Sequence, residues 1–436
     1  MIRFGVIWLL CLFAVASAAQ GSQSIFRGGP SHPGVYDSPA PTQLSLKWVF
    51  PTGGAIVSSP AVAAGVVYVG SADGFLYAVE AATGKLRWKF AAHGDVNSSP
   101  VVAGDTVYVV SLDGNLYAVD AATGNQRWAF ASQGERRFAA AGILGALPSA
   151  EKMPDPWDFY LSSPTVSAGA VYFGSGDSHL YAVDAKTGAL LWSYKTGDVV
   201  HSSPAVSGGV VYAGSWDTYF YALNAATGAL QWKFKTGEDA ATHTMTGIQG
   251  SAAVANGTVY FGCRDANFYA LDATTGALKW KVANDGSWVI SSPAVAGGAV
   301  YYTTSDSHRF QALDAETGKP LYSLPTNIYA FSSPAIAGSH AYFGTFDGQL
   351  HAVDLNKHAY AGVYATPGFA ANGPRALGPD GGLKLGGIWT GDTLDHMIVD
   401  LRAKIFPMGS ILSSPAVADG AVYFGSVDGK LYALGD

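Results

Sequence analysis

The sequence repeats one unit eight times, and this repeat constrains the fold more than any other feature. The unit that starts at Ser58, SSPAVAAGVVYVGSADGFLYAVEAATGKLRWKF, recurs from near residues 98, 162, 202, 250, 291, 332 and 413. Each copy contains four short apolar or alternating runs separated by turns, which is typical of four β-strands. Four strands in roughly 40 to 45 residues form one propeller blade. The sequence therefore predicts an all-β, eight-bladed β-propeller with four-stranded blades.

The two ends of the repeat array predict how the ring closes. The eighth copy stops at LYALGD after its third strand, whereas LSLKWVF at 44–50 forms a strand with no copy of its own. Pairing these segments completes blade eight and removes the exposed edges of an open sheet. We expect an N-terminal extension at 20–43, one propeller domain at 44–436, and insertions at 131–161, 235–249 and 355–412. The last insertion is rich in Gly and Pro and is expected to be irregular.

The first 19 residues have the layout of a secretory signal peptide: one Arg, an apolar run, then small residues ending in ASAA. We therefore expect a monomeric protein secreted across the inner membrane into the periplasm or beyond. After this leader no apolar run approaches the ~18 residues of a membrane span. Cys263 is then the only cysteine, which excludes an intrachain disulfide. The net charge of -7 is spread along the chain and offers no basic patch for nucleic acid.

Five copies carry a complete or nearly complete A-x-D-x-x-T-G-x-x-x-W segment. Thr-Gly forms the turn, with Gly supplying positive φ, and the Trp provides a wide apolar plate whose N–H needs a partner. This segment resembles the tryptophan-docking motif of the PQQ-like (pyrroloquinoline quinone repeat) β-propeller superfamily, which includes quinoprotein alcohol dehydrogenases and the BamB-type outer-membrane assembly protein. The resemblance implies that each indole packs between neighbouring blades. The docking tryptophans are Trp48, Trp88, Trp128, Trp192, Trp232 and Trp280.

Strand direction sorts the loops onto two faces. We call the four strands of a blade A to D in chain order and name each loop by the two strands that it joins. If these strands alternate in direction, the B–C and D–A loops emerge together on one face. All three insertions follow strand D, so this face carries them and the opposite face is expected to be plain. An Asp stands in every B–C turn and a Ser in every strand A, and we interpret both rings as structural, the aspartates as Asx-type turns. The two sets are Asp73, Asp113, Asp177, Asp217, Asp265, Asp306, Asp347 and Asp428, and Ser59, Ser99, Ser163, Ser203, Ser251, Ser292, Ser333 and Ser414.

Candidate binding residues are the positions at which the copies differ. Three polar residues replace the usual apolar residue before Ser-Ser, two large side chains replace small residues in B–C turns, and two others lie on D–A loops. Together they would surround one sector of the insert-bearing face and would suit a planar anion or a peptide carboxylate. Alternatively, each is a surface or loop-packing residue. They are Asn97, His201, Gln249, Trp216, Arg264, His243 and Trp288.

The insertion at 131–161 contains a basic pair and an aromatic run. Arg136, Arg137 and Trp157 are candidates for a lid over the mouth of the ring or for a partner-docking loop. The alternative is that the aromatic residues bury the insertion against blade three.

Two classes of function follow from the resemblance. The first is a periplasmic binding or scaffold propeller, similar to the BamB-type protein, that engages an envelope protein or a small-molecule ligand on the insert-bearing face. The leader, however, lacks the lipoprotein cysteine typical of that family. The second is a PQQ-dependent dehydrogenase that oxidises an alcohol or sugar, for which the resemblance implies PQQ, Ca²⁺ and a stacking Trp, with Trp216 or Trp288 as candidates. The vicinal cysteine pair of many such enzymes is missing, and the sequence assigns neither catalytic residues nor a metal site.

Overall fold

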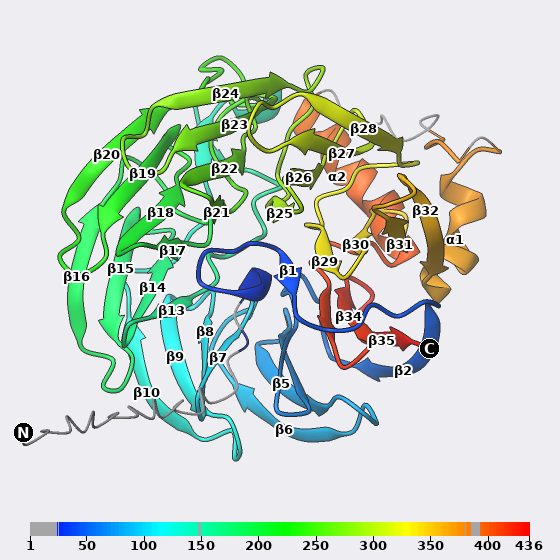
Figure 1. The fold of residues 1–436 in the computed structure, drawn as a ribbon, viewed down its shortest axis with the longest axis horizontal. Coiled ribbons are helices and arrows are strands. Elements are labelled where there is room, and N and C mark those ends of the chain that lie inside the picture. Colours follow the sequence, from blue (N-terminus) through cyan, green and yellow to red (C-terminus); the bar gives the residue numbers. More distant parts are fainter. Residues whose placement is uncertain (1–23, 25, 147–149, 380, 385–392) are drawn as a thin grey trace, which may run out of the picture.

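In the computed structural model, the described residues are 24, 26–146, 150–379, 381–384 and 393–436, and their strands form eight blades around a central axis (Figure 1). The predicted eight-bladed propeller is confirmed. The predicted signal peptide lies outside the described residues.

Each blade is an antiparallel sheet whose strands A to D run from the axis outward. Blades one to four consist of β3 (Ala61–Ala63), β4 (Val66–Gly70), β5 (Phe75–Glu80) and β6 (Leu86–Ala91); β7 (Val101–Ala103), β8 (Thr106–Val110), β9 (Asn115–Asp120) and β10 (Gln126–Ala131); β13 (Thr165–Ser167), β14 (Ala170–Gly174), β15 (His179–Asp184) and β16 (Leu190–Lys195); β17 (Ala205–Ser207), β18 (Val210–Gly214), β19 (Tyr219–Asn224) and β20 (Leu230–Lys235). Blades five to eight consist of β21 (Ala253–Ala255), β22 (Thr258–Gly262), β23 (Asn267–Asp272) and β24 (Leu278–Ala283); β25 (Ala294–Ala296), β26 (Ala299–Thr303), β27 (Arg309–Asp314) and β28 (Pro320–Pro325); β29 (Ala335–Ala337), β30 (His340–Gly344), β31 (Gln349–Asp354) and β32 (Ala359–Ala365); β33 (Ala416–Ala418), β34 (Ala421–Ser426), β35 (Lys430–Gly435) and β2 (Ser45–Pro51).

Blade eight closes the ring with strands from both ends of the chain. Strand β2 pairs antiparallel with β35, so that Val49 lies opposite Tyr432. The carboxylate of Asp436 accepts hydrogen bonds from the main-chain N–H groups of Thr42 and Gln43 at 2.9 and 2.7 Å. The predicted closure by the N-terminal strand is confirmed.

The docking tryptophans join neighbouring blades. Each indole N–H donates to a main-chain carbonyl of the next blade, at 2.8–3.2 Å. Each ring also lies against the Gly of the next Thr-Gly turn; a Cβ on Gly84, for example, would stand 2.8 Å from the Trp48 ring. In blade six Tyr322 takes the place of the Trp and stacks on His358 of blade seven at 4.2 Å.

Two rings of side chains repeat around the axis. The main-chain N–H of each strand-A serine donates to the hydroxyl of the serine in the next blade, and eight such bonds of 2.8–3.1 Å close on themselves. In six blades the B–C aspartate accepts the hydroxyl of a strand-C tyrosine at 2.5–2.8 Å. In blades six and seven Gln311 and His351 stand in place of this tyrosine.

The insertion after blade seven differs from the expectation of irregular structure. The fourth strand of the blade, β32, falls within 355–412, and α1 (Pro367–Ala376), α2 (Leu394–Ile405) and η3 (Phe406–Met408) follow it. Thr366 and Thr393 cap the two α-helices by accepting main-chain N–H groups. In α2 the buried Ile398, Leu401 and Ile405 lie on one face. No helix among the described residues has the length and apolar character needed to cross a membrane.

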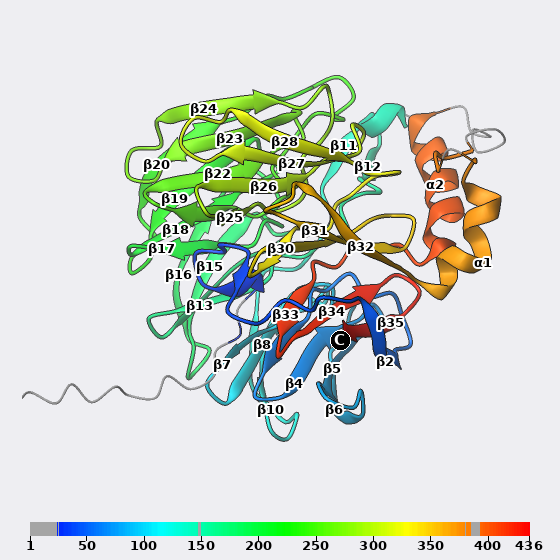
Figure 2. The same cartoon turned by 45° about the vertical axis from the view of Figure 1, so that its right-hand side comes forward.

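The face expected to be plain is instead closed by the N-terminal extension. Residues 26–36, which we call the N-terminal plug, contain η1 (Phe26–Gly28) and β1 (Val35–Tyr36), and they lie over the axis on the side opposite α1 and α2 (Figure 2). Strand β1 adds to β29 in parallel. The short innermost strands leave main-chain N–H groups that need acceptors. Carbonyls of the plug accept these groups in blades four to seven, from Val206, Val254, Val295 and Ile336.

Candidate functional site

The insertion after blade two crosses the mouth of the ring on the insert-bearing face. Its described residues 135–146 and 150–160, which we call the insert plug, contain η2 (Ile143–Gly145) and the hairpin of β11 (Ala139–Ala141) with β12 (Lys152–Pro154). The segment that follows β12 runs from Asp155 to Tyr160 and is mostly buried. The insert plug therefore fills the space that the sequence assigned to a ligand.

Arg264 pairs with a carboxylate of the insert plug. Its Nη1 lies 2.7 Å from Oδ2 of Asp155, and both side chains are 0% exposed. The guanidinium carbon lies 3.8 Å from the ring centre of Trp288 and 4.7 Å from that of Trp216, so both indoles stabilise the cation through their π-faces. Burial raises the pKa of Asp155, and the charge of Arg264 opposes this rise.

His201 lies between two further carboxylates of the insert plug. Its Nδ1 is 2.7 Å from Oδ1 of Asp158, its Nε2 is 2.9 Å from Oε1 of Glu135, and all three side chains are buried. Burial opposes the charged form, but attraction and hydrogen bonds from Asp158, then Glu135, raise the pKa of His201 to about 10. The imidazole is therefore a cation at neutral pH, held by two anions.

The remaining candidates also contact the insert plug. The amide N–H groups of Asn97 and Gln249 donate to the carbonyls of Phe159 and Trp157, at 3.3 and 2.8 Å. The Trp216 ring stacks on Phe138 of the plug, with centres 4.5 Å apart and planes 8° apart.

His243 approaches the Phe138 ring with its edge, at 6.3 Å. Trp288 packs against the guanidinium of Arg264, which pairs with Asp155 of the insert plug. The structure thus brings the candidate residues together, but around a segment of the same chain.

The candidates within the insertion have separate environments. Arg136 is half exposed, and its Nη2 lies 2.8 Å from Oδ1 of Asp198, while Arg137 is exposed. Trp157 is 5% exposed and packs edge-on against Phe331 and Phe346 of blade seven, with ring centres 5.7 and 5.8 Å apart. The expectation that these aromatic residues pack against blade three is therefore wrong for Trp157, because the segment crosses the axis.

The residues at the mouth do not fit a quinone cofactor. Such a group would need an uncovered aromatic face, a cation for its carboxylates and oxygen ligands for Ca²⁺. Phe138 and Arg264 already cover Trp216, and Asp155 already pairs with Arg264. Within the described ranges, no group of three or more His, Cys, Asp or Glu side chains is placed to hold a metal ion. Cys263 is buried, and burial raises the pKa of its thiol, so it is a packing residue.

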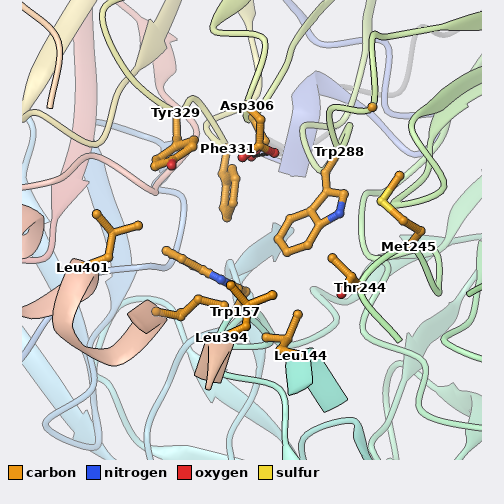
Figure 3. Close-up of a pocket in the computed structure, with 13 residues that line it drawn as sticks. Leu144, Trp157, Thr244, Met245, Trp288, Asp306, Tyr329, Phe331, Leu394 and Leu401 are labelled. Carbon is orange, nitrogen blue, oxygen red and sulfur yellow. Dashed lines mark hydrogen bonds between the residues drawn. The ribbon is translucent and has the colours of Figure 1, made fainter. Parts of the chain in front are cut away.

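A cavity of about 330 Å³ opens between the insert plug, α2 and the loops of blades five to seven (Figure 3). Aromatic and aliphatic side chains form most of its wall, and Asp306 is its only charged lining residue among those described. Sequence reasoning missed Glu135, Asp155 and Asp158, and it did not place Asp306 at this cavity. The acidic residues beside Trp157 in PDPWDFY were the available signal for two of them. The cavity is lined by Leu144, Trp157, Thr244, Met245, Gly286, Trp288, Ser305, Asp306, Tyr329, Phe331, Leu394, Ile398 and Leu401.

Comparison with known proteins gives one family match and many structural matches. A family model described as outer membrane protein assembly factor BamB matches residues 39–151, 148–247 and 235–357. BamB from Moraxella catarrhalis superposes with a TM-score of 0.66 at 17% identity, covering 90% of this chain and 100% of that chain. A europium-containing methanol dehydrogenase gives 0.68 at 15% identity, covering 96% and 99%. Quinohemoprotein alcohol dehydrogenase from Comamonas testosteroni gives 0.68 at 15%, covering 96% and 81%. At these identities the structures share the fold, and no curated protein sequence matches the chain significantly.

Proposed function

Because the chain belongs to the BamB-type family of PQQ-like β-propellers, we propose that it is a binding or scaffold propeller of the cell envelope. Its insert-bearing face would engage an envelope protein or a small-molecule ligand. The observation that carries this proposal is the filled mouth: Arg264 and His201, the groups best suited to an anionic cofactor or substrate, are already paired with Asp155, Asp158 and Glu135 of the same chain. What a partner meets on this face is the outer surface of the insertions.

That outer surface contains exposed apolar residues. Val399 on α2 is 53% exposed, and a groove beside it is lined by Arg402, Phe406, Pro407 and Val427. The groove joins the insertion after blade seven to the B–C turn of blade eight. Exposed apolar surface with a polar rim is typical of a contact surface.

Site-specific photocross-linking tests the binding role. A benzoylphenylalanine placed at Val399 in cells should give a cross-linked adduct of defined mass. The matched control is Leu190, which is 51% exposed on β16 at the outer rim of blade three. An adduct at Val399 and none at Leu190 supports the proposal. Equal labelling at both positions, or none at either, contradicts it.

The alternative function is a PQQ-dependent dehydrogenase, in keeping with the structural neighbours. The purified protein can be titrated with PQQ in the presence of Ca²⁺ while tryptophan fluorescence and dye-linked alcohol oxidation are followed. We expect neither saturable quenching nor oxidation, because the insert plug occupies the mouth of the ring. Saturable PQQ binding together with dye-linked alcohol oxidation would overturn the binding-propeller proposal.

A further inference from the structure

The B–C turn of blade six is one residue longer than the others. Thr303 pairs with Phe310 across this turn, whereas Gly262 pairs with Phe268 in blade five. The main-chain N–H of Ser307 donates to the hydroxyl of Ser287 on the preceding D–A loop. In blade five the B–C aspartate, Asp265, instead accepts the main-chain N–H of Gly237 on the equivalent loop. Ser307 thus takes the turn position, and Asp306 is the additional residue. Its interpretation as one of eight equivalent turn aspartates is therefore wrong.

The additional residue places a carboxylate at the edge of the cavity. Asp306 is exposed and lines the cavity beside Tyr329 and Phe331 (Figure 3). The hydroxyl of Ser305 donates to its Oδ2 at 2.9 Å. No Lys, Arg or His is among the described residues that line the cavity, so its only formal charge is negative.

The rest of the cavity wall is aromatic and aliphatic. Trp157, Trp288 and Phe331 are 4–8% exposed, and Leu401 on α2 is 4% exposed. Arg264 covers one face of Trp288 and is itself fully buried, so the rest of the indole is left to form the cavity wall. A cavity of about 330 Å³ is within the range of small-molecule sites.

We propose that this cavity binds a small organic amine. The protonated nitrogen would lie against Asp306, and the hydrocarbon body would pack among Trp288, Phe331 and Leu401. This inference rests on the proposed binding function and names the ligand class of the insert-bearing face. A carboxylate at the rim of an aromatic wall favours a cation and disfavours an anion of the same shape.

Two neighbouring titratable groups are compatible with a bound cation. His308 packs edge-on against Tyr329, with ring centres 5.1 Å apart. Burial lowers the pKa of His308, and Asp306 opposes this, so its imidazole is neutral at neutral pH. Burial, then the charge of Asp306, raises the pKa of Tyr329 to about 12, so its hydroxyl stays neutral too. Neither group therefore places a positive charge beside Asp306 that would repel the amine.

Three probes of one shape and different charge test the proposal. Isothermal titration with the full-length protein at pH 7 would compare 2-phenylethylamine, 2-phenylethanol and phenylacetate. We expect the amine to bind at least tenfold more tightly than the alcohol, because a charge-assisted contact adds to the shared apolar burial. Phenylacetate should bind more weakly than either. Equal affinity for all three probes, or no binding of the amine, overturns the proposal.

Two variants locate the contact. Asp306→Asn should weaken amine binding about tenfold and leave alcohol binding unchanged. Asp285→Asn is the matched control, because Asp285 is exposed on the neighbouring D–A loop, is not a lining residue and has a positive φ that Asn tolerates. It should change amine binding less than twofold. Equal losses in the two variants contradict the site, whereas the cross-link at Val399 depends on neither result and tests the binding function separately.

Discussion

Both ends of the central channel are closed, but by different kinds of contact: main-chain hydrogen bonds at one end and side-chain ion pairs at the other. The N-terminal plug meets the innermost strands through main-chain carbonyls, and its one buried cation, Arg27, donates to the carbonyls of Ser292, Pro293 and Pro334. The insert plug is held by buried ion pairs at Arg264 and His201. One end depends on backbone geometry that many sequences could supply, and the other depends on a few individual side chains.

This difference changes what a substitution costs. When a buried neutral acceptor loses its hydrogen-bond donor, the free energy of unfolding falls by the desolvation penalty of one polar group. A buried ion that loses its partner is left as an uncompensated charge, which is far more costly, although the intact pair adds little net stability. The insert end should therefore be the more sensitive of the two to single substitutions.

The largest effect is expected for Arg264→Met. This change leaves Asp155 buried without its cation and should lower the free energy of unfolding by about 3–5 kcal/mol, measured by urea denaturation. Arg127→Met is the control, because Arg127 pairs with Asp105 and Asp120 at the surface. That loss should stay below about 1 kcal/mol. Equal losses in the two variants would show that burial of the pair does not matter.

The pH dependence of stability should have opposite signs at the two ends, and His201 determines it at the insert end. The pKa of His201 is raised to about 10, so its contribution is complete below the unfolded value of 6.5 and is lost as pH rises toward 10. Wild-type stability should fall between pH 7 and 9 by up to ~1.4 kcal/mol per unit, and His201→Gln should flatten this slope. A slope unchanged in His201→Gln would assign the titration to another group.

His32 in the N-terminal plug behaves in the opposite way. Burial, then the charge of Arg27, lowers the pKa of His32 to about 3, and its Nε2 lies 3.0 Å from the hydroxyl of Thr165. The neutral ring contributes stability above the unfolded pKa of 6.5 that is lost as pH falls toward 3. Between pH 6 and 4, His32→Asn should lose less stability than the wild type in urea denaturation. A steeper acid loss in the variant would contradict a buried neutral imidazole.

A smaller effect is expected for Arg27→Met in the N-terminal plug. The change removes donors from three carbonyls but leaves no buried charge behind, so the loss should be about 1–3 kcal/mol. Urea denaturation of both variants, Arg27→Met and Arg264→Met, compares the two losses directly. A loss at Arg27 that equals or exceeds the loss at Arg264 would break the distinction between the two ends.

What could be predicted from the sequence follows the same division. The repeat predicts the blades and the ring closure, and departures from it identify Asn97, His201, Gln249 and Arg264 as unusual. Their partners stand in an insertion with no second copy to compare, so the sequence suggested an external ligand instead. The N-terminal plug was missed because main-chain carbonyls carry no sequence signal. The helices α1 and α2 were missed because the Gly and Pro content of the last insertion predicts irregular structure, although Thr366 and Thr393 stand there as capping residues.

The smallest effect is expected midway between the plugs, at the serine ring that the repeat did predict. Ser203→Ala removes the hydroxyl that accepts the main-chain N–H of Ser163 at 2.9 Å. An unpaired buried donor costs about 1–3 kcal/mol. The serines, however, line a chamber of about 40 Å³ together with Asn97 and Gln249, and this chamber is large enough to admit water. A water molecule that bonds this N–H keeps the loss near 1 kcal/mol in urea denaturation. A loss as large as that of Arg264→Met would mean that the chamber excludes water and that the ring, not the insert plug, is the sensitive element of the channel.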